Sequence, residues 1–411
     1  MMKYYTGNNT GDNPGNLPSP YYWWEGGAMF DTLIQYFHLT GDSTYNSLVT
    51  TGILFQTGPN NDFMPPNQTK SEGNDDQSTW ALAAMSAAEA NLPTQGNVSW
   101  IGLAEAVFND QAARWDTTTC NGGLRWQIFA FNNGYTYKNS GSNGFFFQLA
   151  ARLARYTGNT TYSDWASKAY DWTTSVGLID EGYNVYDGAG TTTNCSDITK
   201  LQWSENAATY IVGAAHLYNI TNGSAQTQWK TVLDGLLQRT LPFFFPNSVA
   251  VEIACETQGT CDTDQKAFKG IMAKWLLDTL QVAPYTLETI MPMFTTTAQA
   301  AAQACVSPNS CPFVWTGSLA SEGDGTATGV GEHLDALSFV QGLLVGQASL
   351  ATQNGGGSSS ANAIVSSSST ATGSGAAATA SKNAGVKNGG GKGVRMAMLA
   401  GFLGPVAWLI L

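Results

Sequence analysis

One pattern recurs along the chain and constrains its fold more than any other feature. A helix-length stretch with apolar residues on one face ends in a short turn that contains glycine, and another such stretch follows. The turns are Leu-Thr-Gly-Asp-Ser-Thr-Tyr (39–45), Tyr-Thr-Gly-Asn-Thr-Thr-Tyr (156–162) and Ile-Thr-Asn-Gly-Ser-Ala (220–225). In each turn the glycine can form a left-handed helix C-cap, and the polar residue beside it can cap the next helix. Repeated αα-hairpins favour an all-α toroid, whose inner helices line a cavity, over an irregular helical bundle.

Apolar residues at helical spacing extend this interpretation over the first 353 residues. They predict helices over 28–39, 77–90, 100–115, 144–156, 163–176, 205–218, 225–241, 264–281, 284–304 and 329–350. Long alternating runs of valine and isoleucine, which would indicate a large sheet, are nearly absent. The sequence therefore predicts one all-α domain over residues 1–353.

The C-terminal segment has a different composition. Residues 354–382 are almost all Gly, Ser, Ala, Thr and Asn, which cannot form a core and are typical of a flexible stalk. Within 383–411, three small residues, a polar spacer and an apolar tail follow in the order of a glycosylphosphatidylinositol (GPI) attachment signal. A short transmembrane anchor is the alternative, but the apolar run 396–411 is short for a span. We expect attachment at Asn383, with Asn388 as the second candidate.

Charge narrows the classes of partner. The chain carries 18 basic and 30 acidic residues, and residues 1–353 hold 14 of the basic and all of the acidic ones. This balance argues against nucleic acid and anionic lipid as partners of the folded part, and permits a neutral or cationic ligand. Three histidines far apart in the sequence do not favour a paired-histidine zinc site. No glycine-rich nucleotide motif is visible, so we expect neither a cofactor nor a metal.

Cysteines and glycosylation sequons indicate the compartment. Six cysteines and seven Asn-x-Ser/Thr sequons favour an oxidised, secreted glycoprotein. We expect the bridges Cys255–Cys261 and Cys305–Cys311, which share one short spacing, and Cys120–Cys195, as a preference among about 15 pairings. The first residues contain no apolar run typical of a signal peptide, so the sequence predicts that the chain lacks its true N-terminus.

Loops that precede the predicted helices combine aromatic and planar polar residues, which suits sugars. Flat rings stack on sugar C–H groups, while amide and carboxyl groups bind hydroxyls. Each loop alone is better explained by helix caps or core aromatics, but four such loops on one chain favour a shared cavity. The candidates are Trp23, Trp24, Glu25, Asn133, Tyr135, Lys138, Asn139, Trp203, Asn206, Asp264 and Gln265.

The most specific feature is Gly73-Asn74-Asp75-Asp76-Gln77 at the start of a predicted helix. Two adjacent carboxylates with no basic residue in the motif are costly to ionise together, so the pKa of one rises while the other stays ionised. Glycoside cleavage requires this division between an acid and a nucleophile. The alternative is that two acids in a first helical turn only complement the helix dipole.

Four stretches resemble the fungal branch of glycoside hydrolase family 76, the mannan endo-1,6-α-mannosidase-like proteins. The resemblance covers about residues 3–350 and implies an (α/α)6 barrel and a retaining mechanism. The stretches that carry it are 20–30, 58–65, 73–77 and 133–140.

The resemblance also implies roles for individual residues. Asp75 would be the nucleophile and Asp76 the general acid/base, with Asn74 and Gln77 added to the substrate-binding candidates. Glu205 departs from the family pattern, which more usually has an aromatic residue at this position.

The function that the resemblance implies is a monomeric, GPI-anchored enzyme on the extracellular face of the plasma membrane or in the cell wall. It would act on α-mannoside glycans, cleaving within the GPI core glycan and transferring the released glycoprotein to wall glucan. One alternative is a hydrolytic endo-α-1,6-mannanase that acts on mannan. Another, from a different class, is a non-catalytic glycan-binding wall protein, against which the intact Asp pair argues.

Overall fold

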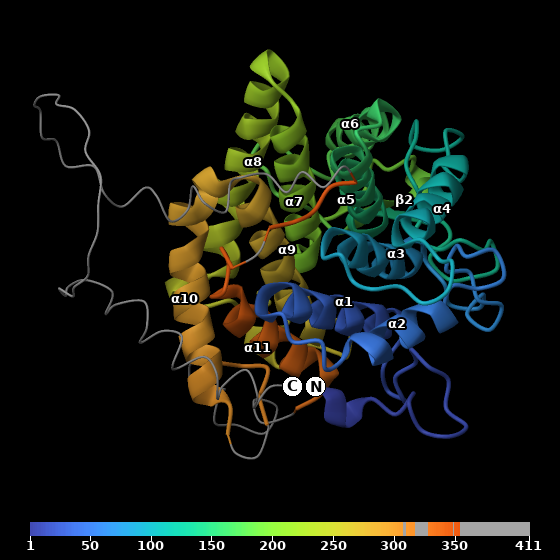
Figure 1. Cartoon of the computed structure of the whole chain (residues 1–411). Helices are drawn as coiled ribbons and strands as arrows, with labels where there is room; N and C mark the ends of the chain where they lie inside the picture. Colours follow the sequence, from blue (N-terminus) through green and yellow to red (C-terminus); the bar gives the residue numbers. More distant parts are fainter. Residues whose placement is uncertain (307–309, 317–327, 348, 354–411) are drawn as a thin grey trace, which may run out of the picture.

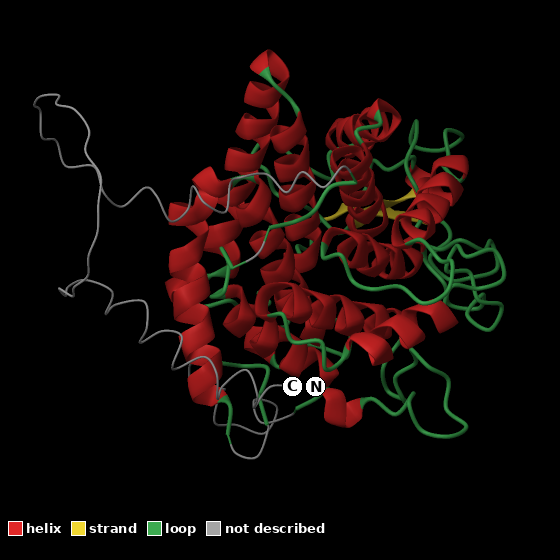
Figure 2. Ribbon diagram, viewed as in Figure 1, coloured by secondary structure: helices red, strands yellow, loops and turns green. Residues whose placement is uncertain are grey.

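The computed structural model describes residues 1–306, 310–316, 328–347 and 349–353. The expected stalk, the attachment segment 383–411 and Asn383 lie outside the described residues. Within the described ranges the chain is predominantly helical (Figure 2). The α-helices are α1 (Trp23–Thr40), α2 (Asn46–Phe55), α3 (Asn74–Glu89), α4 (Trp100–Ala113), α5 (Ser140–Thr157), α6 (Thr160–Ser175), α7 (Ser204–Ile220), α8 (Gly223–Phe244), α9 (Phe268–Val282), α10 (Leu287–Ala304) and α11 (Val330–Gly342).

The odd-numbered helices form a closed ring (Figure 1). In sequence order each packs against the next, from α1 through α3, α5, α7 and α9 to α11, and α11 packs back against α1. The even-numbered helices lie outside this ring, each against its hairpin neighbours. Six inner helices with outer helices between them form an (α/α)6 barrel, which confirms the predicted fold.

Burial distinguishes the two layers. Inner helix α5 buries sixteen of its eighteen residues, whereas outer helix α4 buries six of fourteen. An inner helix faces the barrel interior on one side and the outer helices on the other. Where it approaches a neighbouring helix closely, only a small residue fits between the two. A Cβ atom at Gly213 would lie 2.3 Å from the Phe147 ring, and one at Gly270 would lie 2.7 Å from the Asp335 backbone. Glycine at these positions allows α7 and α9 to approach their neighbours.

The glycine caps expected in these turns are present in two of the three cases, but Asp42 does not cap the next helix, because the N-cap of α2 is Tyr45. Gly41 and Gly158 end α1 and α5 in the left-handed conformation, with φ of 73° and 74°. The side chain of Asn159 accepts a hydrogen bond from the Thr161 amide and caps α6. The third case is wrong, because α7 ends at an extended Thr221 and Gly223 is already the first residue of α8.

Some helix boundaries also differ from the prediction. Helix α2 was not predicted, because its ten residues bury only a narrow face that includes Val49 and Ile53. Helix α11 ends at Gly342 and turns follow it, whereas the apolar pattern predicted a helix to 350. The pattern persists because residues after the helix still pack on the core, as Leu350 does. Helix α9 begins at Phe268, after a 3₁₀ turn over Gln265–Ala267.

A small antiparallel sheet lies beside the N-terminal end of α5. Its strands are β1 (Tyr137–Asn139), β2 (Gly188–Gly190) and β3 (Ile198–Thr199), in the order β1-β2-β3. Asn139 pairs with Gly188 and is also the N-cap of α5. The sheet therefore fixes the direction in which the Asn139 side chain leaves the backbone.

Three disulfides have the expected pairing: Cys120–Cys195, Cys255–Cys261 and Cys305–Cys311. The first closes the longest loop, of 75 residues, and lies in a small apolar cluster with Trp172. It ties the segment before the sheet to the segment after β2. No helix among the described residues is both long and apolar enough to span a bilayer.

Candidate active site

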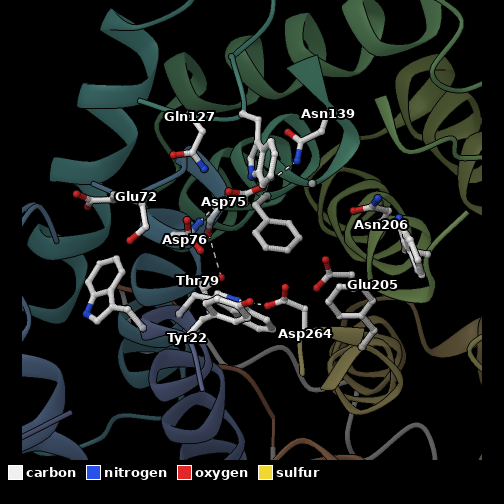
Figure 3. Close-up of a pocket in the computed structure, with 18 of the residues that line it drawn as sticks. Tyr22, Glu72, Asp75, Asp76, Thr79, Gln127, Asn139, Glu205, Asn206 and Asp264 are labelled. Carbon is white, nitrogen blue, oxygen red and sulfur yellow. Dashed lines mark hydrogen bonds between the residues drawn. The ribbon is translucent and has the colours of Figure 1, made fainter. Parts of the chain in front are cut away.

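A cavity of about 470 Å³ opens where the inner helices begin (Figure 3). Helices α1, α3, α5 and α7 contribute their first turns, and the segment before α9 completes the wall. The lining residues are Tyr22, Trp23, Trp24, Gln68, Ser71, Glu72, Asp75, Asp76, Thr79, Trp126, Gln127, Tyr137, Asn139, Gly141, Phe145, Asp187, Trp203, Glu205, Asn206, Asp264, Gln265 and Phe268.

The local backbone explains why these residues meet. The N-cap residues Tyr22, Gly73, Asn139 and Trp203 all have extended backbones, and residues at each of these four helix starts line the same cavity. The N-terminal end of each helix carries a partial positive charge from its unpaired amides. Four such ends around one cavity stabilise negative charge inside it.

Asp75 and Asp76 lie side by side in the first turn of α3 (Figure 3). The Gly73 amide donates to Asp76 Oδ2 at 2.6 Å, and Asn139 Nδ2 donates to Asp75 Oδ2 at 2.8 Å. The Asp76 amide also donates to Asp75 Oδ1, at 3.1 Å. A Cβ atom at position 73 would lie 2.3 Å from Asp75 Oδ1, so only glycine fits beside the pair.

These contacts separate the two carboxyl groups chemically. Burial raises the pKa of Asp75 to about 6, while the hydrogen bond from Asn139 opposes that rise by stabilising the anion. Burial, and then the neighbouring Asp75 charge, raise the pKa of Asp76 well above its ordinary value. Near neutral pH, Asp75 is therefore the ionised member of the pair and Asp76 the protonated one.

The opposite wall of the cavity is also acidic. Glu205 and Asp264 face the Asp pair across the cavity, and Trp24 Nε1 donates to Asp264 Oδ1 at 2.9 Å (Figure 3). Burial and the nearby Asp75 carboxylate raise the pKa of Glu205 well above its ordinary value, and burial raises that of Asp264 to about 6. None of the lining residues is a lysine or an arginine.

Seven of the predicted substrate-binding residues line the cavity along with the Asp pair: Trp23, Trp24, Asn139, Trp203, Asn206, Asp264 and Gln265. Trp203 is held by a hydrogen bond from its Nε1 to Asp187 Oδ1, at 2.9 Å. The aromatic residues at the helix entries therefore flank the cavity, as expected from their positions before the helices.

Six predicted residues do not line the cavity. Glu25 Oε2 accepts from the Tyr22 amide and caps α1, and Lys138 Nζ donates to the carbonyls of Asp116, Thr119 and Gly122. Tyr135 packs its ring on Arg125, and Asn133 is exposed.

The other two residues, Asn74 and Gln77, belong to the Asp motif but are buried behind it. Asn74 donates to the Arg125 carbonyl, and Gln77 donates to the Asp62 carbonyl. Arg114 donates to the side-chain oxygens of both. These residues support the first turn of α3 from behind, so their assignment as substrate ligands was wrong.

The sequence analysis missed more than half of the lining residues, including Glu72, Trp126, Gln127 and Asp187. Glu72 directly precedes the Asp motif, and this adjacency was the only available signal for it. For Glu205 the sequence indicated only a departure from the family pattern, and its position in the cavity was not predicted. Among the described residues there is no group of three or more His, Cys, Asp or Glu side chains that could hold a metal ion.

The model of Glycosyl hydrolase family 76 matches residues 1–354. The chain belongs to this family. It is 42% identical over 367 residues to mannan endo-1,6-alpha-mannosidase DFG5 of Saccharomyces cerevisiae, covering 87% of this chain and 79% of that one. It is 43% identical over 344 residues to mannan endo-1,6-alpha-mannosidase DCW1 of Candida glabrata, covering 82% and 75%.

Comparison with solved structures supports the same family assignment. The crystal structure of Dfg5 from Chaetomium thermophilum in complex with glucosamine is 44% identical, with a TM-score of 0.81 and coverage of 86% of this chain and 90% of that one. The GH76A alpha-1,6-mannanase of Salegentibacter sp. HEL1_6 is 16% identical, with a TM-score of 0.66 and coverage of 84% and 96%, and shares the fold. As a member of family 76, the protein is a glycoside hydrolase.

Proposed function

We propose that this glycoside hydrolase is a retaining endo-α-1,6-mannosidase, with Asp75 as nucleophile and Asp76 as general acid/base. The observation that carries the proposal is the Asp pair in the cavity, where one carboxyl is held as an anion and its neighbour is kept protonated. The names of the relatives DFG5 and DCW1 support the α-1,6-mannoside as substrate.

In the first step, the Asp75 carboxylate attacks the anomeric carbon while Asp76 gives its proton to the departing glycosidic oxygen. A glycosyl-Asp75 ester results, and Asp76 is now an anion. In the second step, Asp76 takes a proton from water or from a sugar hydroxyl, which attacks the ester and regenerates the ionised Asp75. Two inversions at the anomeric carbon give net retention.

The finer proposal is a transglycosidase that cuts at a mannoside of the GPI core glycan and transfers the released glycoprotein to wall glucan. The cavity supports it by its charge, because the Asp75 and Asp264 carboxylates, with no lysine or arginine among the lining residues, favour the ammonium group of the GPI glucosamine. The glucosamine complex of the 44% identical Dfg5 is consistent with this ligand. In this proposal the enzyme is monomeric and GPI-anchored at the extracellular face of the plasma membrane or in the wall.

Product analysis tests both the retaining endo-α-1,6-mannosidase mechanism and the transfer to glucan. The purified enzyme is given an α-1,6-mannooligosaccharide or a GPI core glycan fragment, with and without a glucan oligosaccharide as acceptor. Proton NMR of the first-formed product should show the α-anomer, and the acceptor should appear in a new covalent product. Formation of the β-anomer would contradict the retaining mechanism, and hydrolysis without any acceptor product would leave only the endo-mannosidase.

A hydrolytic endo-α-1,6-mannanase is the second candidate, favoured by the word mannan in the names of the relatives. It shares the first chemical step with the transglycosidase and differs in the molecule that meets the glycosyl-enzyme. With mannan as substrate this enzyme would release oligosaccharides at the same rate whether or not glucan is added.

The hydrogen bond from Asn139 to Asp75 leads to a predicted pH effect. Asn139→Ser keeps an oxygen that can cap α5 but removes the amide donor, so the pKa of Asp75 should rise further. The acidic limb of kcat/KM, expected near pH 6 in the native enzyme, should move to higher pH, and kcat/KM at pH 5 should fall about tenfold. A pH–rate profile checks this. Asn159→Ser changes the asparagine cap of α6 outside the cavity and should leave the profile unchanged.

A further inference from the structure

Glu72 is a buried acid with no assigned role. It lines the cavity, the residue is 1% exposed, and neither carboxyl oxygen has a hydrogen-bond partner in the part of the chain that the structure describes. Burial, and then the nearby Asp76 charge, raise the pKa of Glu72 to about 9. Glu72 is therefore a neutral carboxylic acid that can both donate and accept a hydrogen bond.

The surrounding groups do not satisfy this carboxyl. Arg114 lowers the pKa of Glu72, but it donates its hydrogen bonds to the side chains of Asn74 and Gln77. The backbone carbonyl of Glu72 accepts from the Ile128 amide, which fixes the main chain beside the cavity. A buried polar group without a partner destabilises the fold, so its presence beside a cavity indicates a partner supplied by the substrate.

The position of Glu72 indicates which part of the substrate this is. Glu72 and Asp76 lie on the same side of the cavity, while Glu205 and Asp264 lie on the other (Figure 3). In the proposed mechanism Asp76 protonates the glycosidic oxygen, so the leaving sugar lies on the Asp76 side. Gln68, Ser71 and Gln127 line the cavity as well: the first two precede Glu72 in the same segment, and Gln127 forms an isolated antiparallel bridge with Gly73, the residue after Glu72.

We propose that Glu72 is a specificity-determining residue of the leaving-group subsite, where its carboxyl group hydrogen-bonds a hydroxyl of the departing sugar. The proposal rests on the proposed endo-mannosidase function and deepens it. By microscopic reversibility the same subsite receives the acceptor sugar in the transfer reaction. Glu72 therefore contributes both to the choice of the bond that is cut and to the choice of the acceptor.

The test compares two substrates with the same glycone. In α-1,6-mannotriose the leaving group is a mannose, whereas in phenyl α-1,6-mannobioside it is a phenol, which still needs a proton but has no sugar hydroxyls. Glu72→Met removes the carboxyl at similar size, and kcat/KM for the trisaccharide should fall about 10- to 100-fold. The phenyl glycoside should be cleaved at the wild-type rate. Glu72→Gln, which keeps a donor and an acceptor, should retain most of the trisaccharide activity.

Thermal unfolding of the same preparations separates binding from stability. Because the Glu72 carboxyl has no hydrogen-bond partner among the described residues, Glu72→Met should unfold at or above the wild-type temperature. Gln68→Ala changes a partly exposed residue of the same subsite. It should also lower kcat/KM for the trisaccharide and not for the phenyl glycoside, and it replaces Glu72→Met as the test if that variant does not fold.

Three results would overturn the inference. If Glu72→Met loses kcat/KM equally on both substrates, Glu72 acts through Asp76. If the variant cleaves the trisaccharide as well as the wild type does, Glu72 is only structural. A wild-type enzyme that cleaves neither substrate would overturn the proposed function, and this inference with it, independently of any variant.

Discussion

Asp75→Asn should abolish turnover of α-1,6-mannosides while the barrel stays folded. The amide keeps the size and most of the hydrogen bonds of the carboxylate, but it cannot form the glycosyl ester. We expect kcat to fall about 10³-fold or more, with substrate affinity preserved because Trp23, Trp24 and Trp203 remain in place. Steady-state kinetics together with melting temperatures on the same preparations measure both effects.

Asp76→Asn should also lose activity, but the loss should depend on the leaving group of the substrate. Without the acid, attack by Asp75 remains possible for substrates whose leaving group needs no proton, so activated aryl α-mannosides should be partly rescued. Added azide should speed the second step and give a glycosyl azide with retained configuration. With Asp75→Asn, any azide product should have the inverted configuration.

The competing explanation is that both acids only stabilise the start of α3. It predicts a loss of roughly 0.5–2 kcal/mol in the free energy of unfolding and normal turnover by the folded fraction. Glu288→Gln is the matched control, since Glu288 is an exposed first-turn acid of α10 outside the cavity. Near-normal turnover in both Asp variants would end the assignment of Asp75 and Asp76 as the catalytic residues.

Arg152→Met should destabilise the barrel by about 3–5 kcal/mol. Arg152 on α5 is fully buried, and its Nη2 donates to Glu89 Oε2 at 2.6 Å and to Ser86 Oγ at 2.8 Å, both on α3. Without the guanidinium, Glu89 would be a buried carboxylate without its ion-pair partner. Denaturant unfolding followed by circular dichroism measures the loss.

The ion pair is part of a network that links the inner helices. Lys274 of α9 lies 3.2 Å from Asp31 of α1 and donates to Ser86 and to Asp278. The double variant Arg152→Met/Glu89→Leu should recover much of the stability, because it removes both members of the buried pair and leaves no Glu89 carboxylate without its partner.

An exposed ion pair supplies the control for this prediction. Lys230 and Asp234 form a pair with side chains 45% and 48% exposed, so Lys230→Met should cost less than about 1 kcal/mol. A loss in Arg152→Met as small as that in Lys230→Met would contradict a structural role for the buried pair.

The sequence by itself determined the helical hairpins, the Asp pair and the aromatic loops. Helical periodicity records which face of a helix is apolar, and the glycine turns of residues 41 and 158 record where helices stop. Both signals are local, so they can be recognised without knowing what packs against them. Helix α2 carries too few buried residues to give such a signal, and it was missed.

Only the tertiary structure decided which loop residues enter the cavity. Lys138 and Asn139 are neighbours on β1, and because successive strand residues point to opposite faces, Asn139 reaches Asp75 while Lys138 reaches the Asp116 loop. In the first turn of α3, each residue is rotated by about 100° from the last, so the middle two of Asn74–Gln77 face the cavity and the outer two face away. Glu72 and Glu205 enter the same cavity from distant segments, and nothing local predicts such a meeting, because it depends on the closure of the helical ring.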